Sequence, residues 1–174
     1  MIDFNRKGTL GKKIFVVLIL LMVLLFTKLA THVKVLIVND LEGQKKNEFT
    51  LPGNTFTLGY IHSVLLTPVE ELFRVEQDNT LMLYETIYES FGVGLPYSEE
   101  DGEFEIKDGK FIMKIQRPMD SIKLRVSPIP KHWLSIGAIR YEFIQLVATP
   151  DNLVEIYVMD RWGFKLGGKF YKIY

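Results

Sequence analysis

The stretch "YIHSVLLTPVEEL", residues 60 to 72, gathers hydroxyl, imidazole and carboxyl groups inside an otherwise apolar region. Its polar members are Tyr60, His62, Ser63, Thr67, Glu70 and Glu71. A nucleophile with its base, a ligand site and a buried hydrogen-bonded network are all built from such groups. The strands that carry these side chains decide which of them meet, and therefore which of the three applies.

Alternation along two expected strands turns part of this cluster toward the core. In a strand over residues 55–64, Tyr60 and His62 share the apolar face, and in a strand over 69–77 the apolar face carries Glu71. Pairing of the two strands around "VLLTP" puts His62 opposite Glu71, within side-chain contact. We therefore expect a His62–Glu71 pair at the end of a hairpin.

This expected pair has two interpretations. A carboxylate that faces a core needs a partner, so His62 and Glu71 form a structural pair, and Glu71→Gln then costs a few kcal/mol of stability. Alternatively the two residues belong to a ligand or proton-binding site with a perturbed pKa. The structural pair is the simpler interpretation, because buried polar groups are normally satisfied internally.

Hydrolase and metal chemistry are not indicated. Ser63 follows His62 directly, so on a regular strand the two side chains point to opposite faces and form no nucleophile–base pair. The chain has no G-x-S-x-G motif, no cysteine and no H-x-x-x-H spacing for His32 and His132. We expect no catalytic residue, no metal site and no cofactor.

A second polar stretch, "ESFGVGLPY", covers residues 89 to 97 and contains Ser90, Gly92 and Gly94. The two glycines permit positive φ, and Pro96 fixes the exit of the chain, which predicts a tight loop. An anion-binding backbone nest is the alternative. Arg125 is expected to be a solvated strand residue, with a carboxylate ligand as its alternative partner.

The amino-terminal segment predicts a membrane anchor. An unbroken apolar run from Ile14 to Phe26 follows four basic residues and extends through Ala30 if Lys28 reaches the interface. We expect a signal anchor over residues 14–31, with cleavage as the alternative. Residues 1–13 then stay in the cytoplasm and 33–174 lie outside, which makes this a single-pass protein of the cell membrane.

The rest of the chain predicts an all-β fold, an antiparallel β-sandwich or open barrel behind one transmembrane helix. Asp108-Gly109 predicts a type I′ hairpin turn, and "TPDN" a second turn. Residues 134–148 also suit a helix, and the aromatic tail from residue 160 is a final strand or lies on the membrane. The expected strands are 33–39, 55–64, 69–77, 80–91, 103–107, 110–116, 121–127, 133–139, 141–148 and 153–159.

Length and charge limit the partners. The 174 residues suit one folded domain, and 21 basic against 21 acidic residues leave no positive footprint for nucleic acid.

"YIHSVLLTPVEELF" followed by "SFGVGLP" resembles the family called domain of unknown function 1850. The family shares a Tyr-x-His-Ser-Val, Thr-Pro-Val, Glu core and a later Ser-x-Gly-x-Gly-Leu-Pro. The positions that match the core here are Tyr60, His62, Ser63, Val64, Thr67, Pro68, Val69 and Glu71. The positions that match the later motif are Ser90, Gly92, Gly94, Leu95 and Pro96.

The resemblance implies a partner rather than a reaction. Many family members are encoded beside the membrane subunits of tripartite ATP-independent periplasmic (TRAP) transporters of the TAXI type. The expected function is therefore an accessory subunit of such a transporter, and the expected partners are the membrane and the transporter membrane subunit. The alternative is an extracytoplasmic protein that binds a small molecule or ion.

Overall fold

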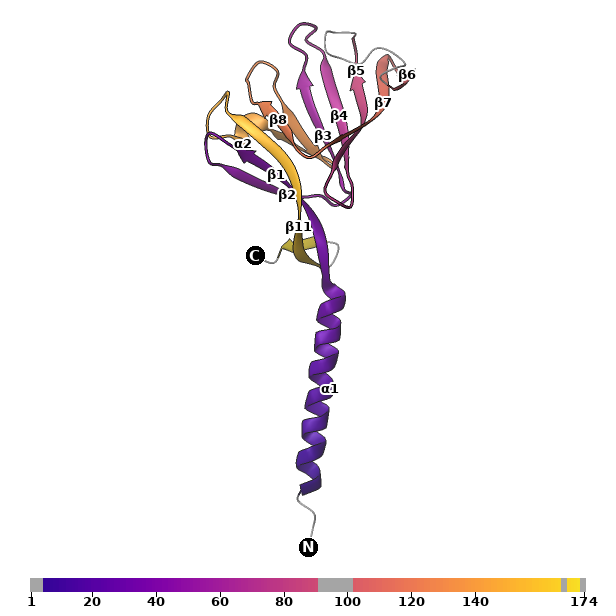
Figure 1. Ribbon diagram of the computed structural model, residues 1–174, viewed down its shortest axis with the longest axis vertical. Coiled ribbons are helices and arrows are strands. Elements are labelled where there is room, and N and C mark those ends of the chain that lie inside the picture. Colours follow the sequence, from indigo (N-terminus) through magenta and orange to yellow (C-terminus); the bar gives the residue numbers. More distant parts are fainter. Residues whose placement is uncertain (1–4, 91–101, 167–168, 173–174) are drawn as a thin grey trace. The chain divides into compact units, whose positions relative to one another are not determined.

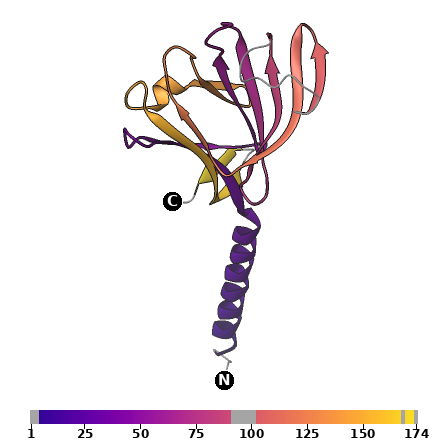
Figure 2. The ribbon, with the colours of Figure 1, turned by 45° about the horizontal axis from the view of Figure 1, so that its top comes forward.

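The computed structural model describes residues 5–90, 102–166 and 169–172, and Figures 1 and 2 show its ribbon from two directions. The chain divides into two compact units. The larger unit is Lys34–Asp160, and the smaller unit joins Met1–Val33 with Arg161–Tyr174.

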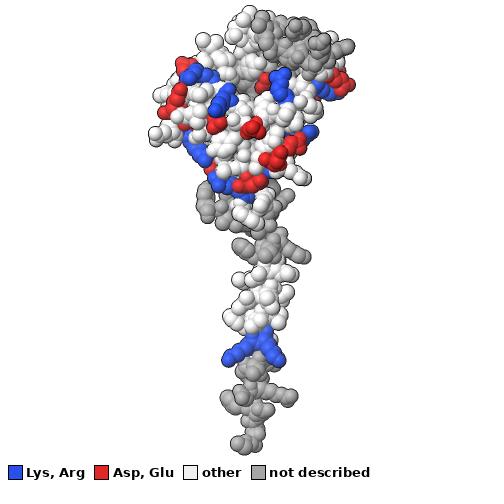
Figure 3. All heavy atoms as spheres, viewed as in Figure 1, with Lys and Arg blue, Asp and Glu red and all other residues white. Residues whose placement is uncertain are grey.

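The smaller unit begins with helix α1, Asn5–Leu29. Side chains from Ile14 to Leu24 are apolar and exposed along the whole stretch, and Figure 3 shows this uncharged part next to basic side chains. Within the described residues, no helix reaches the combination of length and apolar character that a membrane span requires. The helix starts well before the expected segment and stops two residues before its end, where Ala30 and Thr31 already belong to a strand.

Two antiparallel sheets form the rest of the fold. The first sheet has the strand order β12-β11-β1-β2, and β8 also pairs with β11. The second has the order β10-β9-β3-β4-β5-β7-β6. The strands of the first sheet are β1 (Ala30–Asp40), β2 (Lys46–Thr50), β8 (Ile122–Arg125), β11 (Leu153–Leu166) and β12 (Lys169–Lys172). Those of the second are β3 (Thr55–Ile61), β4 (Pro68–Val75), β5 (Leu81–Tyr88), β6 (Glu103–Lys107), β7 (Lys110–Met119), β9 (Trp133–Ile136) and β10 (Ile139–Glu142).

One hydrophobic core lies between the two sheets of the larger unit. Val38 and Ile156 enter it from the first sheet, and the stacked rings of Phe56 and Phe73, with centroids 5.0 Å apart, enter from the second. Burial of this apolar surface is the main favourable term in folding. The expected all-β fold is confirmed, as two antiparallel sheets packed around a common core.

Local turn chemistry was predicted well. Asp108 and Gly109 have φ values of 51° and 76°, both positive as a type I′ turn requires, and they join β6 to β7. The "TPDN" turn is also present, with Asp151 at φ 66°.

The segment 133–148 differs from the two strands expected there. Gly137, at φ 57°, ends the first strand after Ile136, so that β9 and β10 form a hairpin. The chain then makes one helical turn, α2 (Phe143–Leu146), which buries Phe143 and Leu146 on one side. Phe143 and Leu146 are three residues apart, a spacing that places both on one side of a helix. Their burial outweighs the strand preference of the β-branched residues around them.

Strand β2 was missed because its sequence is mostly polar. It pairs by its backbone with β1, from Val35 opposite Thr50 to Asn39 opposite Lys46. In the smaller unit, Gly163 to Leu166 of β11 pair with β12, which confirms the final-strand alternative for the described part of the tail.

Candidate functional site

The motif loop, residues 62–67, connects β3 to β4 and is closed by its own backbone. The N–H of His62 donates to the carbonyl of Thr67 at 2.9 Å, and the N–H of Leu66 donates to the carbonyl of His62 at the same distance. Leu66 has φ 57°, in the left-handed region that a leucine seldom occupies. The loop is therefore a fixed turn whose backbone conformation costs free energy.

The His62 side chain stabilises this loop from inside. Its ring is buried, and Nδ1 accepts hydrogen bonds from the backbone N–H groups of Val64 and Leu65, both at 3.3 Å. A nitrogen that accepts carries no proton, so the neutral ring bears its proton on Nε2. His62 thus satisfies backbone donors of the loop, which the strand assignment over 55–64 did not foresee.

The expected contact between His62 and Glu71 is wrong. It required His62 opposite Glu71, whereas the observed register places Leu58 opposite Glu71 and Tyr60 opposite Val69. Strand β3 stops at Ile61, so the connection is a six-residue loop and the pairing is shifted by four residues. An even shift keeps each side chain on its expected face, and Glu71 still shares the face of the buried Val69 and Phe73.

Glu71 shares the inner face of the sheet with Tyr60 instead, and Tyr60 is paired with Val69, two residues away from Glu71. Burial raises the pKa of the Glu71 carboxyl, and the positive charge of Arg117 offsets only part of that rise. Burial and the negative charge of Glu71 raise the pKa of Tyr60 to about 12. The phenol and the carboxyl are therefore neighbours on the inner face of the second sheet, and the ionised form of each is disfavoured there.

The other motif residues do not join one centre. Ser63 is exposed while the adjacent His62 is buried. The Thr67 hydroxyl oxygen is buried without a hydrogen-bond partner in the described part of the chain. Ser90 is half-buried just beyond the end of β5, and Gly92 and Gly94 lie outside the described residues. Within the same limits, no cluster of three His, Cys, Asp or Glu side chains suits a metal ion.

The large side chains that the motif loop exposes are apolar. The side chains of Val64 and Leu66 are 76% and 73% exposed. A neighbouring loop, held to β3 by a 2.6 Å hydrogen bond from the Ile61 N–H to the Pro130 carbonyl, presents Ile129 at 74% exposure. Sequence reasoning missed this surface, although the apolar "VLL" between His62 and the turn-forming proline was its signal.

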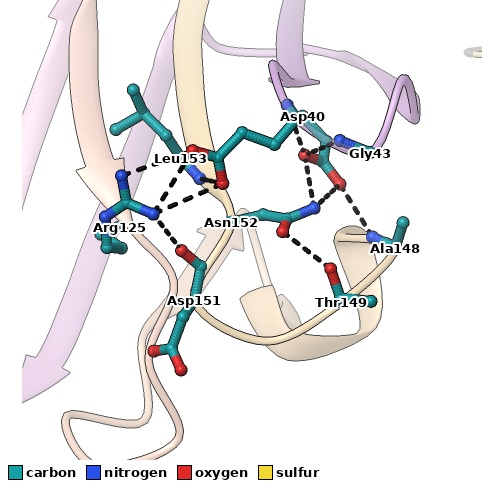
Figure 4. A network of polar contacts seen from close by, with 9 residues as sticks. Asp40, Gly43, Arg125, Ala148, Thr149, Asp151, Asn152 and Leu153 are labelled. Atoms are coloured by element: carbon teal, nitrogen blue, oxygen red, sulfur yellow. Dashed lines mark hydrogen bonds and ion pairs between the residues drawn. The ribbon is translucent and has the colours of Figure 1, made fainter.

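A buried polar network, centred on Asp40 at the end of β1, was also missed (Figure 4). The Asp40 carboxylate is 1% exposed and accepts hydrogen bonds from the side-chain amide of Asn152, at 2.9 Å to each oxygen. The backbone N–H groups of Gly43 and Ala148 donate to it at 2.8 Å, and that of Glu42 at 3.2 Å. Burial raises the pKa of Asp40, but these donors together outweigh burial and hold it below its usual value.

Arg125 belongs to the edge of this network and is not a free ligand group. It donates to the carbonyl of Asp151 and lies 3.4 Å from the Glu42 carboxylate, whose Oε2 accepts the Leu153 N–H at 3.0 Å. Asn152 is fixed in turn by the Thr149 hydroxyl, which donates to its Oδ1 at 2.7 Å. These contacts tie β8, the turn before β11 and the end of β1 together, which indicates a structural role.

Comparison with curated proteins and with solved structures gave no match. A family model does match residues 56–143, just over half of the 174 residues, from β3 through β10 to the first residue of α2. The matched segment contains the motif loop, Tyr60 and Glu71, whereas Asp40 and Asn152 lie outside it. The chain therefore belongs to the family described as Domain of unknown function (DUF1850).

Proposed function

We propose that this protein is a membrane-anchored accessory subunit of a TRAP-type solute transporter of the TAXI type, without catalytic activity of its own. In this proposal residues 14–31 anchor the chain, residues 1–13 face the cytoplasm, and residues 33–174 lie outside the cell. The motif loop is the surface that contacts the transporter membrane subunit.

The observation that carries the proposal is how the motif loop uses its polar groups. The His62 ring and backbone are engaged in hydrogen bonds within the loop, and its large exposed side chains are those of Val64 and Leu66, beside the small hydroxyl of Ser63. A catalytic loop would direct a nucleophile and its base toward the same substrate, whereas here the Ser63 hydroxyl is exposed and the His62 ring is buried. A rigid loop with apolar tips fits contact with another protein, because burial of such side chains drives association.

The anchor assignment is supported by the character of α1. Its side chains from Ile14 to Leu24 are apolar and exposed, and Lys12 and Lys13 precede them. Apolar side chains over three helical turns are costly in water, and a basic flank on one side orients such a segment in a membrane. Extraction of cell membranes with alkaline carbonate tests this part, since an anchored chain stays in the pellet and a peripheral one enters the supernatant.

Replacement of the loop tips tests the contact. Val64→Asp and Leu66→Asp are expected to abolish co-purification of the transporter membrane subunit in mild detergent and to lower solute uptake. Both side chains are mostly exposed, so the fold should persist. The matched control is Ile139→Asp, at a 58% exposed apolar position on β10. Equal co-purification in all three variants would contradict the proposal.

A further inference from the structure

A pocket of about 330 Å³ lies in the larger unit, framed by the loop at residues 127–132, strand β10 and the first turn residues of α2. This volume is at the lower end of the range for small-molecule sites. Its lining combines Lys131, Arg140 and Ser127 with the apolar side chains of Pro128 and Ile144.

We propose that this pocket binds a small organic carboxylate. Its charged lining consists of Lys131, Arg140 and Glu142, so it has one positive charge in excess. One excess positive charge suits a ligand with one negative charge. The apolar side chains of Pro128 and Ile144 suit a hydrocarbon substituent next to the carboxylate. The inference goes beyond the accessory role, and it gives small-molecule binding a site other than the His62–Glu71 pair expected from the sequence.

Arg140 is held in position for an anion. Its guanidinium carbon lies 3.9 Å from the centroid of the Trp133 ring, and its Nε donates to the Glu142 carboxylate at 2.8 Å. Among the described residues, its two terminal Nη groups make no hydrogen bond, so both can donate to one ligand. A planar pair of donors matches the two oxygens of a carboxylate, and an orientation fixed in advance lowers the entropy cost of binding.

Trp133 is itself fixed by the backbone of β3. Gly59 pairs with Trp133 across the sheet, and a Cβ at Gly59 would lie 1.9 Å from the indole ring. Only glycine leaves room for the ring at this distance, so the indole rests against the strand and supports Arg140 from below. In the stack Gly59–Trp133–Arg140 the guanidinium is therefore held in place by strands of the sheet and not by a loop.

The second cation and a hydroxyl come from the neighbouring loop. Within the described part of the chain, the Lys131 ammonium makes no ion pair. The Ser127 hydroxyl oxygen accepts the Ile129 N–H at 3.5 Å, which leaves its proton available to donate. His132 also lines the pocket, with its Nδ1 buried, and the charged and hydroxyl donors available to a ligand are those of Lys131, Arg140 and Ser127.

The test uses the fluorescence of Trp133 in the full-length protein in detergent. The chain has two tryptophans, so Trp162→Phe leaves Trp133 as the single reporter beneath Arg140. The probes are isobutyrate, its uncharged analogue isobutyramide, and inorganic phosphate. We expect a saturable change with isobutyrate in the millimolar range, and no saturable change with isobutyramide or phosphate.

Three variants locate the site. Lys131→Gln and Arg140→Gln are each expected to weaken isobutyrate binding about tenfold, because each removes one charge-assisted contact. Lys131→Gln leaves the stack on Trp133 untouched, so its effect is independent of any change in the reporter. The control Lys123→Gln removes an exposed lysine on β8 that pairs with Glu155, and it should leave binding unchanged.

Each outcome decides the proposal. A saturable isobutyrate signal that weakens in the two pocket variants and persists in the control supports it. Equal binding of isobutyramide or phosphate, an unchanged affinity in Lys131→Gln, or no saturation with isobutyrate overturns it. None of these results depends on a transporter subunit, so the accessory function stands or fails on its own test.

Discussion

Two buried or half-buried carboxyl groups of the larger unit, Asp40 and Glu71, have opposite surroundings. Asp40 receives hydrogen bonds from three backbone N–H groups and from the Asn152 amide, and these hold its pKa below the usual value despite burial. Glu71 lies on the inner face of the second sheet, and burial raises its pKa beyond what Arg117 can offset. The folded protein favours the ionised form of Asp40 and disfavours that of Glu71.

The opposite pKa shifts of Asp40 and Glu71 distinguish a structural network from the candidate functional site. The ionised Asp40 joins the end of β1 to the segment 148–152, so its charge adds to stability. The charge of Glu71 subtracts from stability, and the neighbouring loop also holds Leu66 at positive φ and leaves the Thr67 hydroxyl unpartnered among the described residues. Such costs gather at functional sites more often than at structural ones. The family match includes the Glu71 region and excludes Asp40.

The largest expected effect comes from Asp40→Asn. The asparagine NH2 group would face backbone and side-chain groups that are themselves hydrogen-bond donors. The substitution also removes the negative charge that these donors stabilise. We expect the free energy of unfolding to fall by about 3 kcal/mol at pH 7, measured by thermal unfolding of the full-length protein. Because the pKa of folded Asp40 is lowered, its contribution is present above the unfolded pKa and is lost as the pH falls through the folded value. A decrease of less than about 0.5 kcal/mol in the free energy of unfolding would show that Asp40 does not stabilise the fold.

Gly43→Ala tests the same network through space instead of charge. A Cβ at Gly43 would lie 2.3 Å from Asp40 Oδ2, 2.5 Å from the Ala148 Cβ and 2.8 Å from the Asn152 amide nitrogen. We expect a cost of about 2 kcal/mol, as for overpacked interiors. The control is Gly53→Ala, where the nearest atom is the Thr55 hydroxyl oxygen at 3.7 Å. Equal stability of the two variants would show that the Asp40 network tolerates displacement.

Glu71→Gln should act in the opposite direction. Since the pKa of folded Glu71 is raised, the wild-type protein loses stability as the pH rises from the unfolded value of 4.5 through the folded value. The glutamine variant lacks this loss, so at pH 7 we expect it to be as stable as wild type or more stable by up to about 1 kcal/mol. The two proteins should converge below pH 4. A destabilisation of several kcal/mol would contradict the conclusion that the charge of Glu71 lowers stability.

The smallest effect at neutral pH is expected for Tyr60→Phe. The pKa of Tyr60 is raised to about 12 from 10.0, so the neutral phenol is favoured by folding and wild-type stability declines as the pH rises from 10 toward 12. The phenylalanine variant should match wild type near pH 7 and lose less stability above pH 10. Identical alkaline profiles would mean that the phenol is not shielded beside Glu71.

Much of the fold followed from local rules in the sequence. The Asp108-Gly109 turn and the alternation in β3, β4 and β5 depend on neighbouring residues alone, and they were predicted to within a few residues. Strand β2 was not predicted, because it depends on pairing with β1. A helix over 134–148 was predicted only as an alternative to strands, because α2 depends on burial of Phe143 and Leu146.

The site was predicted in part for the same reason. Alternation placed Tyr60 and Glu71 on the inner face, but the length of the turn decides which residues face each other, and His62 lay in the turn. The Asp40 network joins residues more than 100 positions apart, so no local pattern could reveal it.

The most direct test of the accessory role is site-specific crosslinking from the motif loop in native membranes. The chain has no cysteine, so Val64→Cys can carry a photoreactive group as the single thiol, with Ile139→Cys as the matched position on β10. We predict that Val64→Cys forms one major adduct, identified by mass spectrometry as a transporter membrane subunit, and that Ile139→Cys does not. No adduct from Val64→Cys, or the same adducts from both positions, would contradict the proposal that the motif loop is the contact surface.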